Sequence, residues 1–565
     1  MTGRVVSGLD RRSPKLSADD LYFLPLGGTG EIGMNLNLYG HDGAWLMIDL
    51  GVTFASDSLP GVDVLMPDPS FIAERVEDLA GIVLTHAHED HIGAVPYLWP
   101  RFRCPLYATP FTASLVRRKL IEAGLEKEAE VIEVPLSGQF QVGPFEVELV
   151  TLTHSIPEPN AVVVRCAAGT VLHTGDWKLD PDPLVGDATD ITRLKALAEE
   201  DVLAMVCDST NALVDEEAGS EADVRERLLE VVSGLKKRVA VACFASNVAR
   251  LETVIRVAEA SGRRVALVGR SLHRIVQAAR ENGYLADLPP FVDESEVDYL
   301  PREEVLLICT GSQGEPRAAL WRIAKEQHNH VNLDAGDAVV FSSRVIPGNE
   351  VGIFDLQNAL VKRGIEVITD HDHEIHVSGH PGREELAQMY QWVRPKIAIP
   401  VHGEDRHLAA HAQLARDCQV PHQIVCSNGD LIRLTPGQGE IVTSVPSGRL
   451  ALEGRRLLPL GSSVFQTRKK MSYNGAAFAT VVLDQRGAMD GEAEISLMGL
   501  CDTAESQSDG TILAPAVAEA VARLPRRERR DDSAVEAAVA QAVRRTASRL
   551  WGKKPVTSVH VIRLE

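Results

Sequence analysis

The chain has 565 residues, of which 45% are hydrophobic and 24% charged, and its formal net charge is −21. This length exceeds what one hydrophobic core usually supports, so several domains are expected, and the acidic balance taken alone argues against nucleic acid as a partner. No apolar run approaches the ~20 residues of a membrane-spanning helix, and the opening residues lack the apolar centre of a signal peptide. We therefore expect a cytoplasmic protein with no membrane partner.

The first candidate motif is the segment GGTGEIGMN, residues 27–35, which follows the apolar run LYFLPL and contains G-x-G-x-x-G. In a dinucleotide-binding protein a helix would follow, with its N-terminus facing the pyrophosphate. Here apolar and polar residues alternate instead, and GHDG at residues 40–43 is a turn signal, so a hairpin of two strands is predicted. The glycines are interpreted as a turn with close backbone approach, and Asp49 ends the second strand.

The strongest chemical signal is H-x-H-x-D-H, which follows the apolar strand GIVLT and contains His86, His88, Asp90 and His91. His86 and His88 point the same way from an extended segment, whereas the other two side chains emerge after the chain turns. One motif can therefore serve two adjacent metal ions.

Three more candidate ligands each follow an apolar strand: His154, Asp176 and His402. The Asp176 carboxylate could bridge two ions, because each of its oxygens can bind one. Eight cysteines are scattered without a C-x-x-C pair, which favours reduced thiols over cysteine-bound zinc. Imidazole and carboxylate ligands suit two Zn²⁺ ions and do not exclude Mn²⁺.

Strand-end Asp49, HAHEDH, His154 and HTGD together resemble the successive motifs of the metallo-beta-lactamase superfamily. The resemblance implies an αββα sandwich with a two-metal site along one edge of its sheets. It implies two ligand sets: His86, His88, His154 and Asp176 for one ion, and Asp90, His91, Asp176 and His402 for the other. It also implies that Asp49 orients the ligand loop.

An inserted domain is predicted between Asp176 and His402, because the 225 residues between them exceed one strand-helix-strand crossover. Four strand-then-helix segments predict a parallel α/β unit there. The strand ends carry FASN, GSQGEP and SSRVIPGN. Loops of this kind bind ligands, phosphate above all, at the carboxyl ends of parallel strands, although ordinary turn chemistry would also supply them.

This arrangement resembles the beta-CASP group of nucleases. Its motif A matches Asp208 in MVCDSTN, motif B matches His380 in HVSGHP, and motif C matches His402 in PVHGE. In that group a histidine at motif C goes with RNA substrates, whereas DNA-repair members usually carry valine. The resemblance therefore favours RNA.

FASNVARL, TGSQGEP, SSRVIPGNE and HVSGHP, with the glycine-rich segment, narrow the resemblance to the ribonuclease J family over about residues 20–450. It implies a ribonuclease with 5′ to 3′ exonuclease activity on 5′-monophosphorylated single-stranded RNA, plus endonuclease activity, in RNA maturation and decay. It also implies a homodimer and RNA-decay partner proteins.

The predicted fold class is α/β, with five parts along the chain. These are a flexible arm (1–18), the first lactamase part (19–208), the beta-CASP insert (209–370), the second lactamase part (371–450), and a linker with a small α+β domain (451–565). In that last domain Asp532 is expected to cap the final long helix and Gly552 to end it.

Candidate roles are given to further residues. The candidate catalytic residues are His380, Asp208 and Asp90. His380, held in orientation by Asp208, is the candidate for protonating the leaving 3′ oxygen or stabilising its charge. RNA phosphate contacts are expected from His376, Ser378, Ser342, Ser343 and Arg344. Phe244 could stack on a base, although a phenylalanine after VAVAC is more often plain core.

Other histidines are not assigned to the site. His371 and His373 are interpreted as part of a solvated strand approach. His407 and His411 lie four apart, a spacing that suits a metal on a helix, but a surface helix face is the favoured interpretation.

The basic C-terminal segment is a further surface of interest. Residues 521–565 carry eleven Lys and Arg against five Asp and Glu, a local balance of +6. A solvated helix face and a surface that contacts a polyanion both explain this reversal of charge.

Three alternative functions fit the sequence less well. A small-molecule hydrolase such as a thioesterase or lactonase is disfavoured by the insert with its three motifs. A non-catalytic RNA-binding scaffold would have lost ligands, whereas all seven are present. A DNA nuclease is disfavoured by His402 alone.

Overall fold

The computed structural model describes residues 16–55, 59–500 and 506–564. The chain forms two compact units, Met1–Thr53 with Leu65–Arg449 and Phe54–Val64 with Leu450–Glu565. The expected flexible arm falls almost entirely outside the described residues. Among the described residues, no helix combines the length and apolar character needed to cross a membrane.

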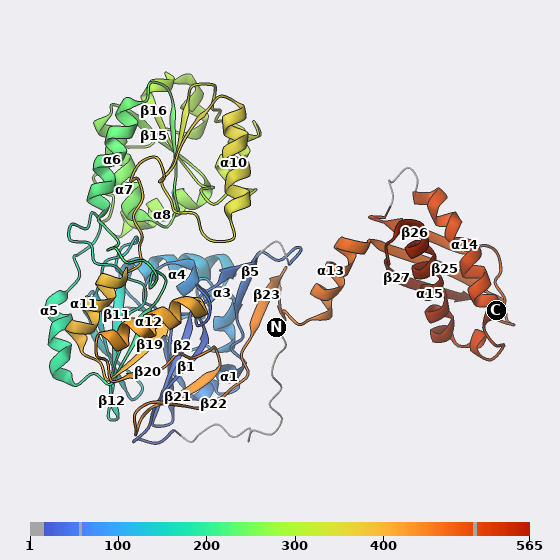
Figure 1. The fold of residues 1–565 in the computed structure, drawn as a ribbon, viewed down its shortest axis with the longest axis horizontal. Coiled ribbons are helices and arrows are strands. Elements are labelled where there is room, and N and C mark those ends of the chain that lie inside the picture. Colours follow the sequence, from blue (N-terminus) through green and yellow to red (C-terminus); the bar gives the residue numbers. More distant parts are fainter. Residues whose placement is uncertain (1–15, 56–58, 501–505, 565) are drawn as a thin grey trace. The chain divides into compact units, whose positions relative to one another are not determined.

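The first layer of the larger unit is an eight-stranded mixed sheet with the order β22-β21-β1-β2-β3-β6-β7-β8 (Figure 1). Its strands are β1 (Leu21–Gly27), β2 (Leu36–His41), β3 (Ala44–Ile48), β6 (Leu79–Val83), β7 (Leu106–Ala108), β8 (Val131–Glu133), β21 (Asp430–Thr435) and β22 (Glu440–Ser444). β2 and β3 pair antiparallel, from Asn37 opposite Ile48 to His41 opposite Ala44. The hairpin predicted after the glycine-rich segment is therefore confirmed. Two short strands, β4 (Thr53–Phe54) and β5 (Val64–Pro67), lie between β3 and β6 in the chain.

The second layer is a seven-stranded sheet with the order β20-β19-β13-β12-β11-β10-β9. Its strands are β9 (Gln139–Val142), β10 (Phe145–Thr151), β11 (Asn160–Cys166), β12 (Gly169–His173), β13 (Ala204–Asp208), β19 (Ile397–Val401) and β20 (His422–Gln423). β9 to β12 run antiparallel to one another, whereas β12, β13, β19 and β20 are parallel. The carboxyl ends of β10, β12, β13 and β19 consequently lie at the same edge of the sheet.

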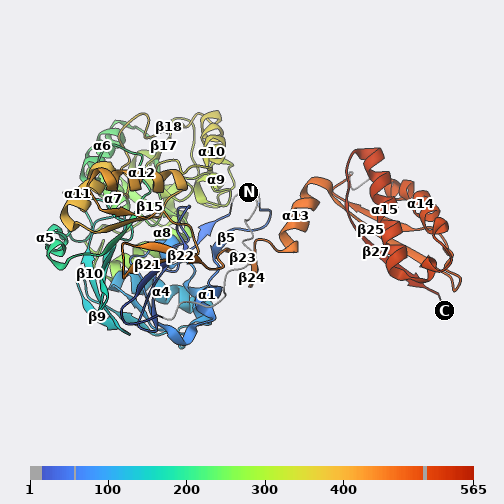
Figure 2. The ribbon, with the colours of Figure 1, turned by 60° about the horizontal axis from the view of Figure 1, so that its bottom comes forward.

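A hydrophobic core between the two sheets joins these layers. Side chains of both sheets, including Phe23 and Leu46 from the first and Val162 and Val206 from the second, form one buried cluster. Three helices, α5 (Ile191–Ala196), α11 (Arg383–Val393) and α12 (Asp405–Asp417), pack against the outer face of the second sheet (Figure 2). Four more lie between β5 and β8 in the chain: α1 (Ser70–Ala73), α2 (Glu89–Ile92), α3 (Val95–Leu98) and α4 (Pro110–Ala123). This is the αββα sandwich that the sequence predicts.

The insert between β13 and β19 is a five-stranded parallel sheet with the order β15-β16-β14-β17-β18. Its strands are β14 (Val239–Ala242), β15 (Arg264–Val268), β16 (Val305–Cys309), β17 (Ala338–Phe341) and β18 (Glu366–Ile368). Its helices are α6 (Glu221–Gly234), α7 (Val248–Ala260), α8 (Arg270–Glu281), α9 (Ala319–Ala324) and α10 (Glu350–Lys362). Four of the strands are each followed by a helix, which confirms the predicted parallel α/β unit.

The smaller unit holds α13 (Ser463–Asn474), α14 (Ser506–Arg523), α15 (Asp532–Trp551) and the hairpin β23 (Arg449–Glu453) with β24 (Arg456–Pro459). A three-stranded sheet, β26 (Glu494–Met498), β25 (Ala476–Leu483) and β27 (Val556–Arg563), packs one face against α14 and α15. Gly552 ends α15 in the left-handed conformation, as expected, but Asp531 rather than Asp532 caps its start.

Some basic side chains of the C-terminal segment form ion pairs, and others line a groove. Arg523 pairs with Glu519 and Arg563 with Asp532. Arg544, Arg545 and Lys554 line an open groove along α15.

Glu148 in β10 joins two arginines within the larger unit. Arg193 Nε donates to Glu148 Oε1, and Arg165 Nη2 donates to Oε2, each at 2.5 Å. Burial would raise the pKa of Glu148, but the two guanidinium groups outweigh burial and lower the pKa to about 2.

The charged Glu148 carboxylate should therefore stabilise the fold above pH 4.5, its usual pKa, and this contribution is lost as the pH falls toward 2. Glu148→Gln should lower the unfolding temperature at pH 7, and its gap from the wild type should narrow on acidification below pH 4.5. The control is Glu146→Gln, because Glu146 is exposed and approaches Arg165 at 3.5 Å. A gap that stayed the same down to about pH 3 would contradict this account.

Candidate metal centre

Strand ends bring all seven predicted ligands to one edge of the sandwich. The loop after β6 carries the H-x-H-x-D-H motif, and His154, Asp176 and His402 follow β10, β12 and β19. These side chains form two groups whose potential ligand atoms lie within 4.8 Å of one another: His86, His88, His154 and Asp176, and Asp90, His91, Asp176 and His402. Asp176, which is 3% exposed, belongs to both groups.

The first group is built around three imidazoles. His88 Nδ1 lies 3.0 Å from His86 Nε2 and 3.1 Å from His154 Nε2. His86 Nε2 is 3.9 Å from Asp176 Oδ2. Ligand atoms about 2.1 Å from a tetrahedral zinc ion lie roughly 3.4 Å apart, so these separations suit one ion.

The second group contains the same carboxylate. Asp176 Oδ2 lies 3.1 Å from His91 Nε2 and 3.5 Å from His402 Nε2. Asp90 Oδ2 completes the group, 3.6 Å from each of these two nitrogens. The spacing again suits one ion, with Asp176 placed between the two groups.

For three of these histidines, hydrogen bonds from outside the groups determine which ring nitrogen is free. His154 Nδ1 donates to the Gly379 carbonyl, and His91 Nδ1 donates to Asp49 Oδ2 at 2.7 Å. The Thr85 hydroxyl donates to Asp49 and lies 3.0 Å from His86 Nδ1, from which it can accept. Each contact leaves the Nε2 lone pair facing its group, which is the tautomer that a metal requires.

The glycine-rich segment supports His402. His402 Nδ1 donates to Asn35 Oδ1 at 3.0 Å, Asn35 Nδ2 donates to the Asp90 carbonyl, and the His402 amide donates to the Gly28 carbonyl. Asn35 was not among the residues singled out from the sequence. Its role could not be inferred from the sequence, because it depends on a contact with His402, 367 residues away.

The donor set fits divalent metal ions. His402 Nε2 is buried without a hydrogen-bond partner, which is costly unless a cation binds there. Burial lowers the pKa of His86 and His154 well below 6.5 and that of His88 to about 4, so these rings are neutral, the form that binds metal. Burial would also lower the pKa of His91, but Asp176 and Asp49 raise it, so a cation would replace a proton there.

His380 and Asp208 form a pair beside the second group. His380 Nδ1 lies 2.8 Å from Asp208 Oδ2 and 3.9 Å from Asp176 Oδ2. Burial would lower the pKa of His380, but the Asp208 carboxylate outweighs burial and raises it to about 9. The pair therefore offers a proton donor, or a positive charge, next to the predicted metal ligands.

The loop from 375 to 380 carries two of the predicted phosphate contacts together with His380. Asn211 Nδ2 donates to the Ser378 hydroxyl at 2.7 Å and to the His380 carbonyl at 2.9 Å. Gly379 must be glycine here, because a Cβ would lie 2.6 Å from His154 Cε1. His376 and Ser378 are half-buried.

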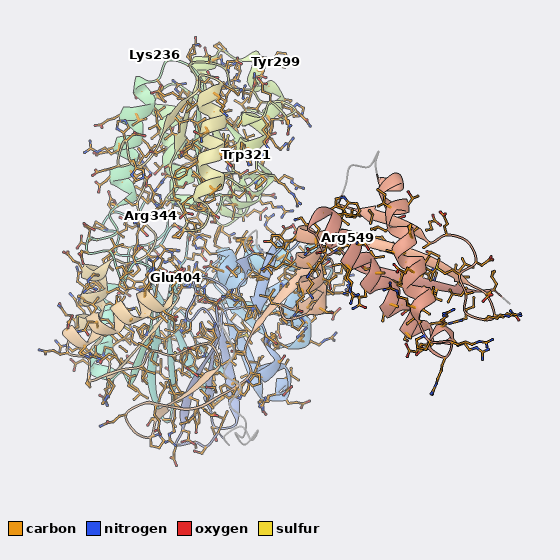
Figure 3. All side chains as sticks on the ribbon, turned by 45° about the vertical axis from the view of Figure 1, so that its right-hand side comes forward. Lys236, Tyr299, Trp321, Arg344, Glu404 and Arg549 are labelled. Atoms are coloured by element: carbon orange, nitrogen blue, oxygen red, sulfur yellow. The ribbon has the colours of Figure 1, made fainter. Side chains whose placement is uncertain are left out.

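The other predicted RNA contacts differ in their surroundings. Ser342 is 2% exposed, and its hydroxyl donates to the Ile375 carbonyl and accepts from Arg250. The expectation of a direct phosphate contact for Ser342 is thus corrected, because its hydroxyl serves the protein interior. Ser343 is 5% exposed, Phe244 is half-buried, and Arg344 is exposed at the end of the insert that adjoins the sandwich (Figure 3).

The interpretation of His407 and His411 as a surface face of α12 is wrong. His411 is fully buried between the Ser209 hydroxyl at 2.8 Å and the Tyr390 hydroxyl at 2.9 Å. His407 is 7% exposed and accepts from the Glu404 amide at the start of α12. Both support the loops after β13 and β19. His371 and His373 are exposed, in agreement with a solvated approach.

The sandwich, the parallel insert and the paired ligand groups together define a metal-dependent hydrolase of the metallo-beta-lactamase superfamily. The model of that superfamily matches residues 33–216, and the model named Zn-dependent metallo-hydrolase RNA specificity domain matches residues 364–424. The beta-CASP and C-terminal domain models of ribonuclease J match residues 236–360 and 463–564. The chain belongs to the ribonuclease J family, and it is a metal-dependent ribonuclease.

Whole-length relatives agree with this assignment. The chain is 45% identical to ribonuclease J of Sinorhizobium meliloti, covering 97% of this chain and 98% of the relative. It is 38% identical to ribonuclease J of Mycolicibacterium smegmatis, covering 96% of each. A crystal structure of an Enterococcus faecalis protein of unknown function shares the fold, with a TM-score of 0.51 and 17% identity over 73% of this chain and 100% of that one.

Asn35→Ala should weaken metal binding at the group containing His402, about 10- to 100-fold, because it removes the acceptor that orients this imidazole. Metal content after dialysis against buffers of graded free Zn²⁺ measures the effect. Asn37→Ala is the matched control, because Asn37 on β2 is similarly buried, at 1% exposed, and its Oδ1 atom has no hydrogen-bond partner. Equal metal loss in both variants would contradict the assigned role of Asn35.

Proposed function

We propose that the chain is a two-metal ribonuclease that degrades single-stranded RNA from the 5′ end, favours 5′-monophosphorylated RNA, and also cleaves internally. The observation that carries the proposal is one loop, 375–380, which holds both the candidate phosphate contacts and His380 beside the ligand groups. A 5′ phosphate bound by His376 and Ser378 would sit at a fixed distance from the bond to be cleaved. Such positioning is what a processive end-dependent nuclease needs.

The metal ligands of the proposal are the seven residues of the two groups: His86, His88, His154, Asp176, Asp90, His91 and His402. A pair of bound divalent ions supplies an acidified water and stabilises negative charge on the phosphodiester. Asp49 keeps the His91 ring oriented through their 2.7 Å hydrogen bond. We favour Zn²⁺ as the native ion, because five of the seven ligands are imidazoles, and Mn²⁺ is the alternative.

His380 is proposed to donate a proton to the leaving 3′ oxygen, or to stabilise its charge. Asp208 holds the Nδ1 side of the ring, so Nε2 is free to face the substrate. Asn211 fixes the His380 backbone through its carbonyl oxygen. Arg344 is exposed at the end of the insert that adjoins the sandwich, and it supplies positive charge for the RNA phosphates. Phe244 is proposed to stack on a base.

A homodimer acting with RNA-decay partner proteins in the cytoplasm completes the proposal. Exposed apolar side chains on α10 support an association surface, with Val351 74%, Phe354 54% and Val361 58% exposed. The sedimentation coefficient of the full chain in solution tests the dimer.

The activity itself is tested with matched substrates. RNA carrying a 5′ monophosphate, RNA carrying a 5′ triphosphate, circular RNA and DNA of the same sequence are incubated with Zn²⁺ or Mn²⁺, and products are resolved by length. We expect mononucleotides from the monophosphorylated RNA, internal cuts in circular RNA and no cleavage of DNA. The proposal fails if no RNA is cleaved with either ion.

His380→Ala should leave the metal content unchanged and lower kcat on the order of 10²- to 10⁴-fold, because only proton donation or charge stabilisation is removed. Metal analysis and single-turnover cleavage of the same preparation separate the two effects. His373→Ala, an exposed histidine on the same approach, is the control. Unchanged turnover in His380→Ala would overturn the assignment.

A further inference from the structure

A fully buried arginine lies behind the loop 375–380. Arg250 on α7 is 0% exposed, and its guanidinium binds Glu221 in two places: Nε donates to Oε2 and Nη2 to Oε1, each at 3.0 Å. Glu221, at the first position of α6, is 2% exposed. The pair is therefore held away from solvent on both sides.

The third arm of the guanidinium connects the insert to the loop. Arg250 Nη1 donates to the Ser342 carbonyl at 2.9 Å, to the Ser342 hydroxyl at 2.6 Å and to the Ile375 carbonyl at 3.2 Å. Nη1 also lies 3.5 Å from His376 Nδ1. The Ser342 hydroxyl in turn donates to the Ile375 carbonyl at 2.7 Å. One side chain thus links α6, α7, the end of β17 and the first residues of the loop.

Further buried charges continue this network toward the metal ligands. Asp180 accepts from the Ser220 hydroxyl at 2.7 Å and from the Glu221 amide at 3.1 Å, so it anchors the start of α6. Lys178 pairs with Asp180 at 2.9 Å, and its amide donates to the carbonyl of Thr153, the residue before His154. Lys178 itself comes two residues after Asp176. The segments that carry two predicted metal ligands are therefore tied to the segment that carries His376.

A buried ion pair of this kind rarely adds stability beyond what well-packed apolar side chains would give, because desolvating both charges is costly. Its directional hydrogen bonds do restrict the backbone that they contact. Arg250 cannot itself touch RNA, since none of its surface is exposed. Any effect on the reaction must pass through Ile375 and His376.

We propose that the Arg250–Glu221 pair positions the loop 375–378 against the metal ligands, and thereby determines the preference for a 5′-monophosphate end. Arg250 is then a positioning residue for end recognition. The inference rests on the proposed function, because it assigns the phosphate contact to this loop. End-dependent cleavage then needs the loop held in a fixed position relative to the metal ligands. Internal cleavage does not use a terminal phosphate and does not need this.

The test is Arg250→Lys in the full chain, because lysine keeps the charge but cannot make the bidentate contact with Glu221. The control is Arg238→Lys. Arg238 is also buried in the insert, 1% exposed, but it binds Asp298 and the carbonyls of Val297 and Asn332 at the amino end of β14. Lys236, two residues before Arg238, lies at the end of the insert far from the sandwich (Figure 3). Arg344, two residues after the Ser342 that Arg250 binds, lies at the end near the sandwich.

Each variant is measured on three RNAs of one sequence: 5′-monophosphorylated, 5′-triphosphorylated and circular. Arg250→Lys should lower the ratio of kcat/KM for monophosphorylated over triphosphorylated RNA on the order of 10- to 100-fold, mainly through KM. Cleavage of circular RNA and the metal content should stay at the wild-type level. Arg238→Lys should lower the unfolding temperature but keep the wild-type ratio.

A milder variant guards against misfolding of Arg250→Lys. Ser342→Ala removes one link between Arg250 and Ile375, and should lower the same ratio less. The double variant should show no further loss beyond Arg250→Lys, because both changes break one network. Additive losses would mean that Ser342 acts independently of Arg250, and would overturn the proposed route.

Equal loss on all three RNAs in Arg250→Lys, matching that of Arg238→Lys, would also overturn the inference, because it would show a purely structural role. A wild-type enzyme that cleaves circular RNA but shows no end preference would instead refute the 5′-monophosphate part of the proposed function. Failure of the two ideas can therefore be told apart.

Discussion

The buried carboxylate of Asp176 is the point on which the rest of the site depends. It is 3% exposed, and its Oδ2 atom lies within 3.9 Å of nitrogens of His86, His91, His380 and His402. Burial would raise the pKa of Asp176, but His402 and His91 hold it well below 3.8. A charged group in this position is tolerable only where positive charge surrounds it, so both sheets must deliver their ligands to it together.

The fold meets this demand by alignment of strand ends. The parallel run β12, β13, β19 places Asp176, Asp208 and His402 along one edge, and β6 of the other sheet brings the histidine motif to the same edge. The hydrogen bonds behind the ligands then choose the tautomers: Asp49 for His91, Asn35 for His402 and the Gly379 carbonyl for His154. The insert contributes to the same edge because its loops and α7 follow the carboxyl ends of its strands. The predicted metal ligands and His380 thus lie together at one edge of the larger unit.

Much of this arrangement could be predicted from the sequence, because it depends on local sequence patterns. The H-x-H-x-D-H spacing needs only a strand followed by a turn, and each strand-helix repeat of the insert is a short segment with its own period. Tertiary contacts were harder to foresee. Asn35 meets His402 across 367 residues, and the Ser209–His411–Tyr390 contacts depend on the packing of α11 against α12. Ser342 was expected to contact RNA because it lies in a polar loop. Its hydroxyl is held in the interior by the buried guanidinium of Arg250, and the helical pattern of α7 does not predict that this arginine is buried.

The most direct test of the account is anomalous X-ray scattering at the zinc edge from crystals of the full chain grown with Zn²⁺. The account predicts two ions per chain on either side of the Asp176 carboxylate. One should be bound by His86, His88 and His154, and the other by Asp90, His91 and His402. A single ion, or ions bound away from Asp176, would contradict it.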